Sequence, residues 1–280
     1  GVISGVNSPD NDHGTAVIGE FSADANNFGV SGISSEAHVS AVSLETHDTA
    51  TAIVIAADRL RPGDLMLLEV HAGGPAWPGS DFTDFGYIAV EWWPENYDAI
   101  RYAVSKGIIV VEAAGNGGQN LNDPLYNIPQ EGFPTNWKNP FNPANPSSGA
   151  ILVGAGNPPV GIHGRDAQPD WGEPYVDRSR CYFSNYGERI DTQGWGWEVT
   201  STGYGDIQGG MFNRDVWYTD QFSGTSSASP IIVGTIACVQ GILRANGRTP
   251  LSPEQARQLL RTTGSPQQDG PGFRFIPNMT

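Results

Sequence analysis

The stretch "GIIVVEAAGNGG", residues 107–118, predicts a buried strand that runs into a turn of small residues. Its apolar residues are continuous, as in strands that are covered on both faces of a parallel sheet. Directly before it, residues 95–105 have the apolar spacing of a helix, and Lys106 and Gly107 are typical of a helix end. A helix that leads into a buried strand is one half of a strand–helix–strand crossover.

The same order continues on both sides of this stretch. Residues 49–60 also have helical apolar spacing. Short apolar runs rich in β-branched residues predict further strands at residues 38–44, 65–70 and 151–153, beside the strand at 108–111. Strands that alternate with helices imply right-handed crossovers and a mainly parallel sheet.

Size and two long segments complete the predicted organisation. The 280 residues, 38% of them hydrophobic, contain no long linker, so we expect residues 1–280 to form a single domain. Residues 75–94 are rich in aromatic side chains, and residues 117–149 are rich in Asn and Pro. Both segments interrupt the alternation, and we predict that they are surface excursions.

Composition argues against several classes of partner. The chain carries 30 acidic and 15 basic residues, a formal charge of −15 that repels nucleic acids and anionic membrane surfaces. Its strongly apolar runs, such as residues 231–239, are far shorter than the roughly 20 residues that cross a bilayer. Two cysteines, Cys181 and Cys238, cannot build a metal cluster by themselves, so no metal site is predicted. Because Gly1 stands where an initiator methionine would, we expect a processed or excised product.

Three polar residues stand where a folded sheet could use them for chemistry. Asn116 follows the strand, where it can be a turn former or donate its amide to an oxyanion. Ser226, in "FSGTSSASP", precedes an apolar helix, where it can be a plain N-cap or a hydroxyl beside the positive helix terminus. Pro230 is then expected in the first helical turn. His13, in "DHGTAVIGE", opens a helical pattern and can be a solvated side chain or a base.

The combination of these residues favours nucleophilic catalysis over the three separate structural readings. A serine hydroxyl is a weak nucleophile near neutral pH and needs a base, for which neutral imidazole is suited. An amide donor then stabilises the oxyanion that forms. We therefore predict that His13, Asn116 and Ser226 form an active site.

The segments "DHGTAVIGE", "AAGNGG" and "FSGTSSASP" together resemble the three signature regions of the subtilisin-like serine proteases, the subtilases. "HAGGP" is similar to the family's substrate-binding strand end, and "SPEQARQLLRTTG" to its C-terminal helix. The resemblance implies a three-layer α/β/α sandwich with a mainly parallel central sheet, and peptide-bond hydrolysis through an acyl-enzyme. It implies no required cofactor and allows a structural calcium ion.

Carried over by position, the resemblance implies that Ser226 is the nucleophile, that His13 is the general base, and that Asn116 with the Ser226 N–H forms the oxyanion hole. His71 stands where the family commonly has a small serine, so it narrows the P1 pocket or faces solvent, and we favour solvent. Two walls of the site for a peptide or protein substrate are also implied, one that pairs with the extended substrate and one that bounds the P1 pocket: Val70, His71, Ala72 and Gly73, and Ala113, Ala114 and Gly115.

The family's third catalytic group, an aspartate that orients the imidazole, has no counterpart in this order. It comes a few dozen residues before the histidine, and only twelve residues precede His13. Asp10 and Asp12 lie in the turn that leads to His13, from where the far side of the ring is hard to reach. Three explanations stay open: a separate N-terminal fragment that stays bound and fills a strand slot, which we favour; an acid from an insertion, such as Asp84; or an impaired enzyme.

Two other functions stay open on the same scaffold. In a transpeptidase or macrocyclase an amine intercepts the acyl-enzyme, and the two excursions could shield the site from water. A pseudoprotease would keep the cleft and bind peptides without catalysis. Since many members of the resembled family are exported, the expected location is secreted or extracytoplasmic.

Overall fold

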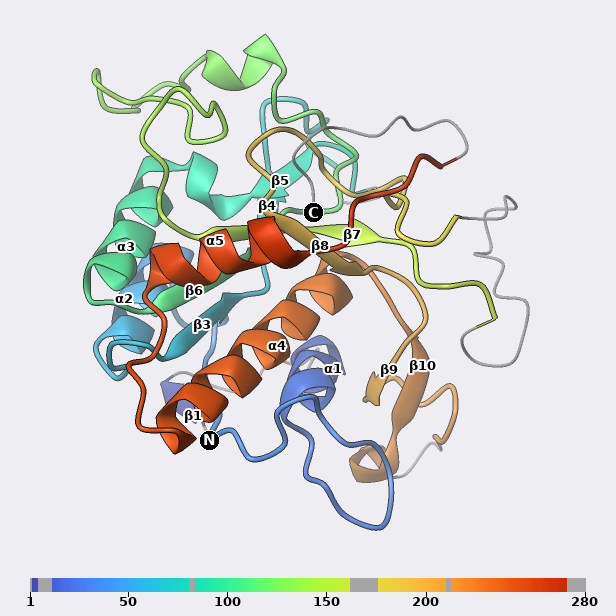
Figure 1. Cartoon of the computed structure of the whole chain (residues 1–280). Coiled ribbons are helices and arrows are strands. Elements are labelled where there is room, and N and C mark those ends of the chain that lie inside the picture. Colours follow the sequence, from blue (N-terminus) through green and yellow to red (C-terminus); the bar gives the residue numbers. More distant parts are fainter. Residues whose placement is uncertain (1, 5–11, 81–83, 162–175, 210–212, 271–280) are drawn as a thin grey trace.

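The computed structural model describes residues 2–4, 12–80, 84–161, 176–209 and 213–270. Helices and strands alternate along most of this length (Figure 1). In chain order they are, with 3₁₀ helices labelled η, β1 (Val2–Ser4), α1 (Asp12–Ser22), β2 (Ala41–Val42), α2 (Thr49–Ala57), β3 (Leu65–Leu68), β4 (His71–Gly73), β5 (Tyr87–Ala89), η1 (Val90–Trp92), α3 (Pro94–Ser105), β6 (Ile109–Ala113), η2 (Pro124–Asn127), β7 (Ile151–Gly156), β8 (Thr192–Trp195), β9 (Val199–Thr202), η3 (Arg214–Val216), β10 (Tyr218–Phe222), α4 (Thr225–Ala245) and α5 (Pro253–Thr263).

Four parallel strands form the main sheet, in the order β3-β6-β7-β8. Successive residues of β6 face opposite sides of it, as the strand period of two requires. Ile109 and Val111 lie in a core cluster with α1 and α4, whereas Val110 lies in a second cluster with α2 and α3. Helices therefore cover both faces of the sheet, which confirms the predicted three-layer α/β/α sandwich.

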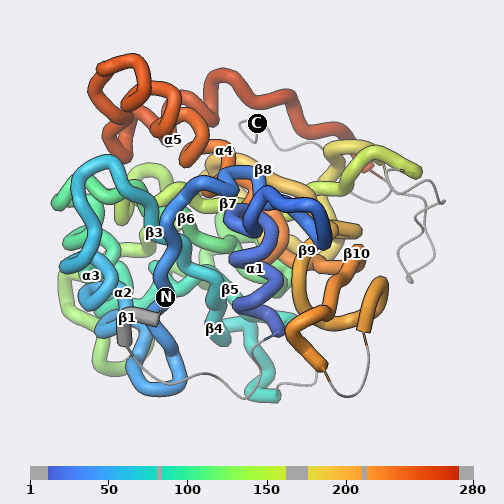
Figure 2. Tube along the Cα trace, turned by 90° about the horizontal axis from the view of Figure 1, so that it is seen from below, coloured from blue at the N-terminus to red at the C-terminus, as the bar shows by residue number. Residues whose placement is uncertain are grey.

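Three smaller strand pairs surround the main sheet: β1 with β2 in parallel, and β4 with β5 and β9 with β10 antiparallel. The β9–β10 pair leads directly into α4, and it also packs against α1. Figure 2, seen from below, shows α1 beside β9 and β10. This contact brings the start of α1 next to the start of α4.

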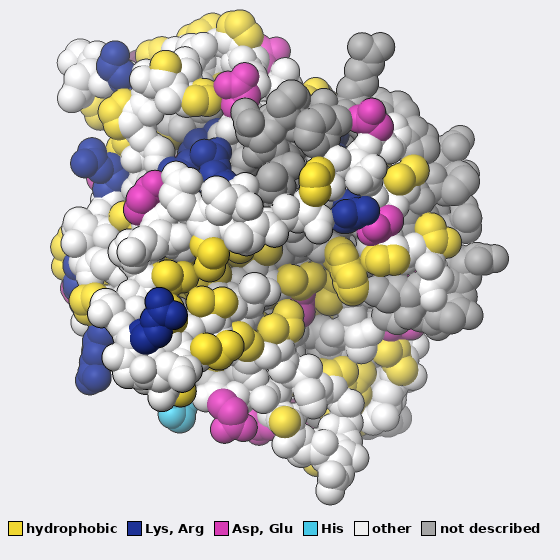
Figure 3. Space-filling view, viewed as in Figure 1, with side chains coloured by type: hydrophobic (Ala, Val, Ile, Leu, Met, Phe, Trp, Pro, Cys, Tyr) yellow, Lys and Arg dark blue, Asp and Glu magenta, His cyan; other side chains and the backbone are white. Residues whose placement is uncertain are grey.

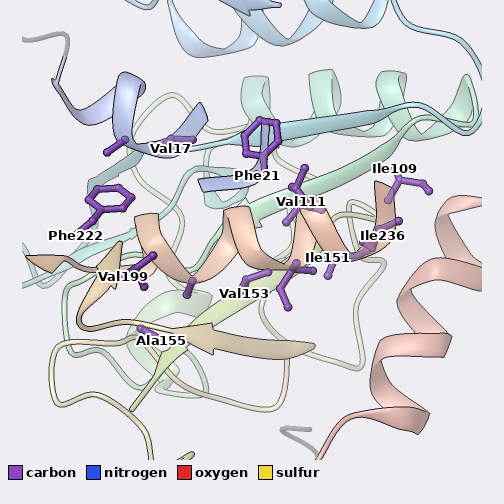
Figure 4. Close-up of a cluster of buried hydrophobic side chains, with 14 of the residues drawn as sticks. Val17, Phe21, Ile109, Val111, Ile151, Val153, Ala155, Val199, Phe222 and Ile236 are labelled. Carbon is purple, nitrogen blue, oxygen red and sulfur yellow. The ribbon is translucent and has the colours of Figure 1, made fainter. Parts of the chain in front are cut away.

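α4 is the central helix of the larger core cluster. Side chains of the sheet, such as Val111 and Val153, gather around it with Val17 and Phe21 of α1 (Figure 4). By length and composition α4 could cross a membrane, but half of its most apolar eighteen residues are buried inside the protein. Further apolar side chains lie at the surface over α4 (Figure 3). α4 is longer than the apolar run noted in the sequence, and it packs as a core helix.

The predicted elements agree with the observed ones where local signals are strong. α3 ends at a C-cap, Lys106, and Gly107 follows with φ +80°, a conformation that glycine adopts without steric cost. The strands predicted at residues 65–70, 108–111 and 151–153 are β3, β6 and β7. Of the strand predicted at residues 38–44, the structure contains only the two residues of β2. Among the described strands only the three-residue β1 pairs with it.

The prediction that residues 75–94 and 117–149 are surface excursions is wrong in part. Their aromatic and aliphatic side chains form a third core cluster, which includes the fully buried Ile88, Trp92 and Phe141. Trp92 also donates its Nε1–H to the Tyr126 carbonyl at 3.0 Å. The two segments thus pack against each other instead of extending separately into solvent, and the buried apolar area stabilises them.

Candidate active site

His13, Asn116 and Ser226 line one cavity of about 320 Å³. His13 is the second residue of α1, Ser226 is the second residue of α4, and Asn116 follows the carboxyl end of β6. All three side chains are half-buried. The other residues that line the cavity are Tyr204, Asp206, Thr219, Gln221, Phe222 and Ser223.

The turn into α4 presents Ser226 to the cavity. The N-cap of α4 is Gly224, whose φ of +93° favours glycine, so the reading of Ser226 as a plain N-cap is wrong. A methyl group added at Gly224 would also lie 3.1 Å from Asn116 Nδ2. Pro230 lies in the second turn of the helix and not in the first as predicted. Because proline has no N–H, the Ser226 carbonyl lacks the usual helical donor.

Asn116 is held so that its amide nitrogen remains available to a ligand. Its Oδ1 accepts hydrogen bonds from the Thr225 backbone N–H and from Thr225 Oγ1, both at 2.9 Å. Because Oδ1 accepts both hydrogen bonds, the orientation of the Asn116 side-chain amide is fixed, and Nδ2 is its donor end. The Nδ2 group therefore stays close to Gly224, at the turn that carries Ser226.

The start of α1 is fixed by contacts with β9 and β10. Thr202 Oγ1 donates to the Thr15 carbonyl at 2.8 Å, and Ser201 Oγ donates to the Ala16 carbonyl. The His13 ring meets Phe222 edge to face, with ring centroids 5.8 Å apart. Since Phe222 ends β10 just before the Gly224 turn, His13 and Ser226 are held by the same short segment.

The profile of the subtilase family matches residues 5–275. The chain belongs to the subtilase family. The predicted class, a subtilisin-like serine protease, is thereby confirmed as a family assignment.

Related proteins and structures agree with this assignment. The chain is 26% identical to an intracellular serine protease of Paenibacillus polymyxa, over 95% of this chain and 66% of that protein. It is also 26% identical to the minor extracellular protease Epr of Bacillus subtilis (strain 168), over 94% of this chain and 32% of that protein. The structure of patellamide maturation protease PatA shares the fold with a TM-score of 0.59 and 22% identity, over 96% of this chain and 80% of that one. The chain spans between 21% and 66% of the length of the curated relatives that it matches.

Carboxylates near His13 were only partly anticipated from the sequence of this subtilase. Asp10 lies outside the described residues, and Asp12 forms an ion pair with Arg214. Asp84 acts electrostatically on His71. Asp206, which the sequence did not single out, lines the cavity and accepts hydrogen bonds from the Asp220 N–H at 3.2 Å and Gln221 Nε2 at 3.3 Å. Asp206 lies in the loop between β9 and β10, and no local sequence pattern marks this position as functional.

Two enclosed carboxyl groups, Glu20 and Glu69, were also missed. Glu69 directly follows β3, and Ser229 Oγ donates to its Oε1, while its Oε2 is buried without a hydrogen-bond partner. Burial raises the pKa of Glu69 to about 8, and the hydroxyl groups of Ser229 and Ser226 lower it by less. Glu20 is 6% exposed, and burial, then repulsion by Glu69, raises its pKa well above the usual range. The sequence signal that could have identified Glu69 is its position directly after an apolar strand.

His71 does not simply face solvent, which corrects the expectation that we favoured. Its Nδ1 accepts the Asn116 backbone N–H at 3.3 Å, and its ring stacks on Tyr87 with centroids 4.5 Å apart. Burial lowers the pKa of His71, Asp84 raises it by less, and His13 lowers it further. The lowered pKa favours the neutral ring, the form that can accept a hydrogen bond at Nδ1.

The space between the two predicted substrate walls is occupied by β5. One wall, residues 70–73, contains β4, which pairs antiparallel with β5. The other wall, residues 113–115, approaches β5 from the opposite side: a methyl group added at Gly115 would lie 3.2 Å from the Ile88 backbone. The P1 pocket expected between these walls is therefore filled, because residues 75–94 return as a strand. The assignment of Val70, His71, Ala72, Gly73, Ala113, Ala114 and Gly115 to substrate binding stays a prediction.

Calcium is the metal ion that the family resemblance allows. Within the described part of the chain, no three His, Cys, Asp or Glu side chains are placed to hold a metal together. In the loop after α1, Asn26 Oδ1 already accepts the Phe28 N–H at 2.9 Å. Calcium binding therefore stays a prediction that rests on the family resemblance.

Proposed function

We propose that this subtilase is a serine endopeptidase that hydrolyses peptide bonds through an acyl-enzyme on Ser226. His13 acts as general base and then as general acid, and Asn116 with the Ser226 N–H forms the oxyanion hole. The observation that carries the proposal is the single cavity that all three residues line. In this proposal residues 1–280 act as one peptidase domain.

The geometry supports a defined sequence of proton and bond changes. Ser226 Oγ attacks the substrate carbonyl while its proton passes to His13, and the carbonyl oxygen becomes an oxyanion. The Asn116 amide, whose oxygen is held by Thr225, donates to that oxyanion together with the backbone N–H at the start of α4. His13 then protonates the departing amine, and water hydrolyses the acyl-enzyme by the reverse proton transfers.

The carboxylate that orients His13 comes, in this proposal, from a separate N-terminal fragment that adds a strand beside β3. Among the described strands β3 pairs on one side only, with β6, and its Leu65 and Leu67 are half-buried. A parallel strand added there would end at the same edge of the sheet as β3 and β6, near Glu69 and Asn116. Exposed strand edges are normally covered, which favours such a partner.

Labelling with a small fluorophosphonate tests the chemistry at Ser226. We expect rapid labelling of the protein, none of Ser226→Ala, and at least 1,000-fold slower labelling of His13→Ala. Asn116→Ala should slow labelling by about 100-fold, because one oxyanion donor is lost. Ser105→Ala, at the far end of α3, is the matched control and should label normally. An unlabelled Ser226 in folded protein would favour a binding module over an enzyme.

Products and partners test the rest of the proposal. Mass spectrometry of the cleaved peptides should show linear products; cyclic products would favour a transpeptidase. Native mass spectrometry should show a noncovalently bound N-terminal peptide that contains an aspartate, and full activity without any such peptide would contradict its role. The relatives are named both intracellular and extracellular proteases, so an extracytoplasmic location stays a prediction.

A further inference from the structure

The P1 side of the active site is filled by a strand of the chain itself. β3 and β6 are direct neighbours as far as Leu68 and Glu112. After this pair, the segments that follow β3 and β6 separate, and β5 lies between these two segments. It pairs with β4 through Ala72 and Ile88, and on its other side the Gly86 N–H donates to the Gly117 carbonyl at 3.3 Å.

Buried contacts hold β5 in this position. The fully buried Asn185 donates from Nδ2 to the Tyr87 carbonyl at 2.8 Å and to the Ala114 carbonyl at 2.7 Å. One amide group thus joins β5 to the wall that follows β6. Ile88 and Ala89 are also fully buried, and Ile88 belongs to the third core cluster. Removing β5 would expose this apolar surface and break these hydrogen bonds, so the strand is a fixed part of the fold.

Little space remains beside β5 for a substrate side chain. A methyl group added at Gly117 would come within 2.2 Å of the Tyr87 carbonyl oxygen, and one added at Gly74 within 2.7 Å of the Ile88 side chain. Around the strand, the Tyr87 ring stacks on His71, and the Trp77 ring lies 5.7 Å from Tyr87. Because His71 contacts the Asn116 backbone, this row of rings reaches from β5 to the oxyanion hole.

We propose that β5 and the Tyr87 ring restrict the residue whose carbonyl Ser226 attacks to glycine or alanine. The inference rests on the proposed function and names the substrate class of the same site. A side chain larger than a methyl group would need the space that β5 occupies. The cavity that His13, Asn116 and Ser226 line includes no residue of β5 in its lining.

A peptide series that differs only at the attacked residue tests the proposal. With glycine, alanine, leucine or phenylalanine at that position, we expect kcat/KM to fall by about 100-fold or more from glycine to phenylalanine. Cleavage after phenylalanine or leucine at a rate equal to or above that after glycine would overturn the proposal. Such a result would leave the proposed function intact, since the chemistry would still have occurred.

A substitution on β5 links this preference to the strand. Tyr87→Ala removes the ring beside His71, and the ratio of kcat/KM for leucine over glycine should rise at least tenfold. Tyr102→Ala, an exposed tyrosine on α3, is the matched control and should keep the original ratio. An unchanged ratio in folded Tyr87→Ala would show that the ring does not set the limit, and would overturn the proposal.

A binding measurement keeps the test independent of turnover. Fluorescence anisotropy on Ser226→Ala compares labelled peptides that end in glycine or in phenylalanine at the attacked position. We expect the glycine peptide to bind at least tenfold more tightly. Tighter binding of the phenylalanine peptide overturns the inference alone, whereas absence of binding by both peptides overturns the proposed function and the inference with it.

Discussion

In the proposed mechanism, His71 supports the oxyanion hole through a hydrogen bond from the Asn116 N–H that only its neutral ring can accept. His71→Asn keeps an acceptor near the position of Nδ1 and cannot be protonated, whereas His71→Ala removes it. We expect His71→Asn to retain most of kcat and His71→Ala to lose about tenfold, with KM less affected, because the donor Asn116 acts mainly in the transition state.

The pH dependence of the same variants separates this positioning role from simple packing. Burial lowers the pKa of His71, so protonation and loss of the hydrogen bond occur below the pH at which a solvated histidine titrates. The acid limb of kcat in the wild-type protein should therefore be steeper than in His71→Asn, which lacks the protonation of His71. Parallel acid limbs would contradict the role assigned to His71.

The raised pKa of Glu69 predicts that the folded protein becomes less stable as the pH rises. Its pKa is raised to about 8 from an ordinary value of 4.5, so between these values the unfolded chain has released a proton that the folded chain keeps. Protonated Glu69 contributes fully to the free energy of unfolding below pH 4.5. This contribution is lost progressively as the pH rises toward 8. Glu69→Gln should flatten this decline, although Glu20 leaves part of it, because its pKa is raised for the same reason.

Thermal unfolding followed by circular dichroism from pH 5 to pH 9 measures this effect. Glu69→Gln should gain melting temperature relative to wild type as the pH rises, by roughly the equivalent of 1.4 kcal/mol for each unit of pKa shift at most. Glu131→Gln, on an exposed loop, should follow the wild-type curve. Parallel curves for wild type and Glu69→Gln would show that Glu69 is ionised in the folded protein at all of these pH values.

At the scale of elements, a buried ionic cluster connects the sheet with α5. Asp191, which directly precedes β8, accepts from Arg189 Nη1 and from Arg257 Nε, both at 2.7 Å. Arg261 Nε lies 2.8 Å from the same carboxyl group. Arg189 also contacts Glu91 at 3.4 Å and is almost fully buried, so its charge depends on these two carboxyl groups.

Removing one member of this cluster should be strongly destabilising. Asp191→Ala leaves the Arg189 guanidinium buried with fewer partners, and we expect the free energy of unfolding in urea to fall by about 3–5 kcal/mol. Asp58→Ala, which breaks an exposed pair with Lys106, is the control and should change stability little. A similar loss of unfolding free energy in Asp191→Ala and Asp58→Ala would contradict the prediction that the buried ion pairs contribute more to stability than the exposed one.

Elements with complete local signals could be predicted from the sequence, and those that depend on distant partners could not. α3 carries its own periodicity and a C-terminal glycine, and β6 and β7 are continuous apolar runs. β5 has three residues, and its position depends on β4, which precedes it by more than a dozen residues, and on Asn185. The motifs predicted that His13, Asn116 and Ser226 would meet, but the roles of Glu69 and Asp206 depend on tertiary neighbours that no local pattern records.

At the scale of the whole molecule, the formal charge of −15 should attract cationic peptides. For a glycine-containing substrate that also carries lysines away from the cleavage site, kcat/KM should fall several-fold between low salt and about 0.3 M salt, because the Debye length shortens. A neutral peptide of the same length is the control and should change little. Equal salt dependence for both peptides would show that the acidic surface does not steer substrates.

In the proposed mechanism, the strand that restricts the acyl side, β5, belongs to the segment between β4 and α3, whereas the nucleophile, the base and the amide donor belong to α4, α1 and the turn after β6. Substrate selectivity and bond-making would thus depend on separate segments of the same polypeptide. Exchanging the β4–α3 connection between relatives should therefore transfer a preference for one cleavage sequence to another protease, with the reaction itself left untouched.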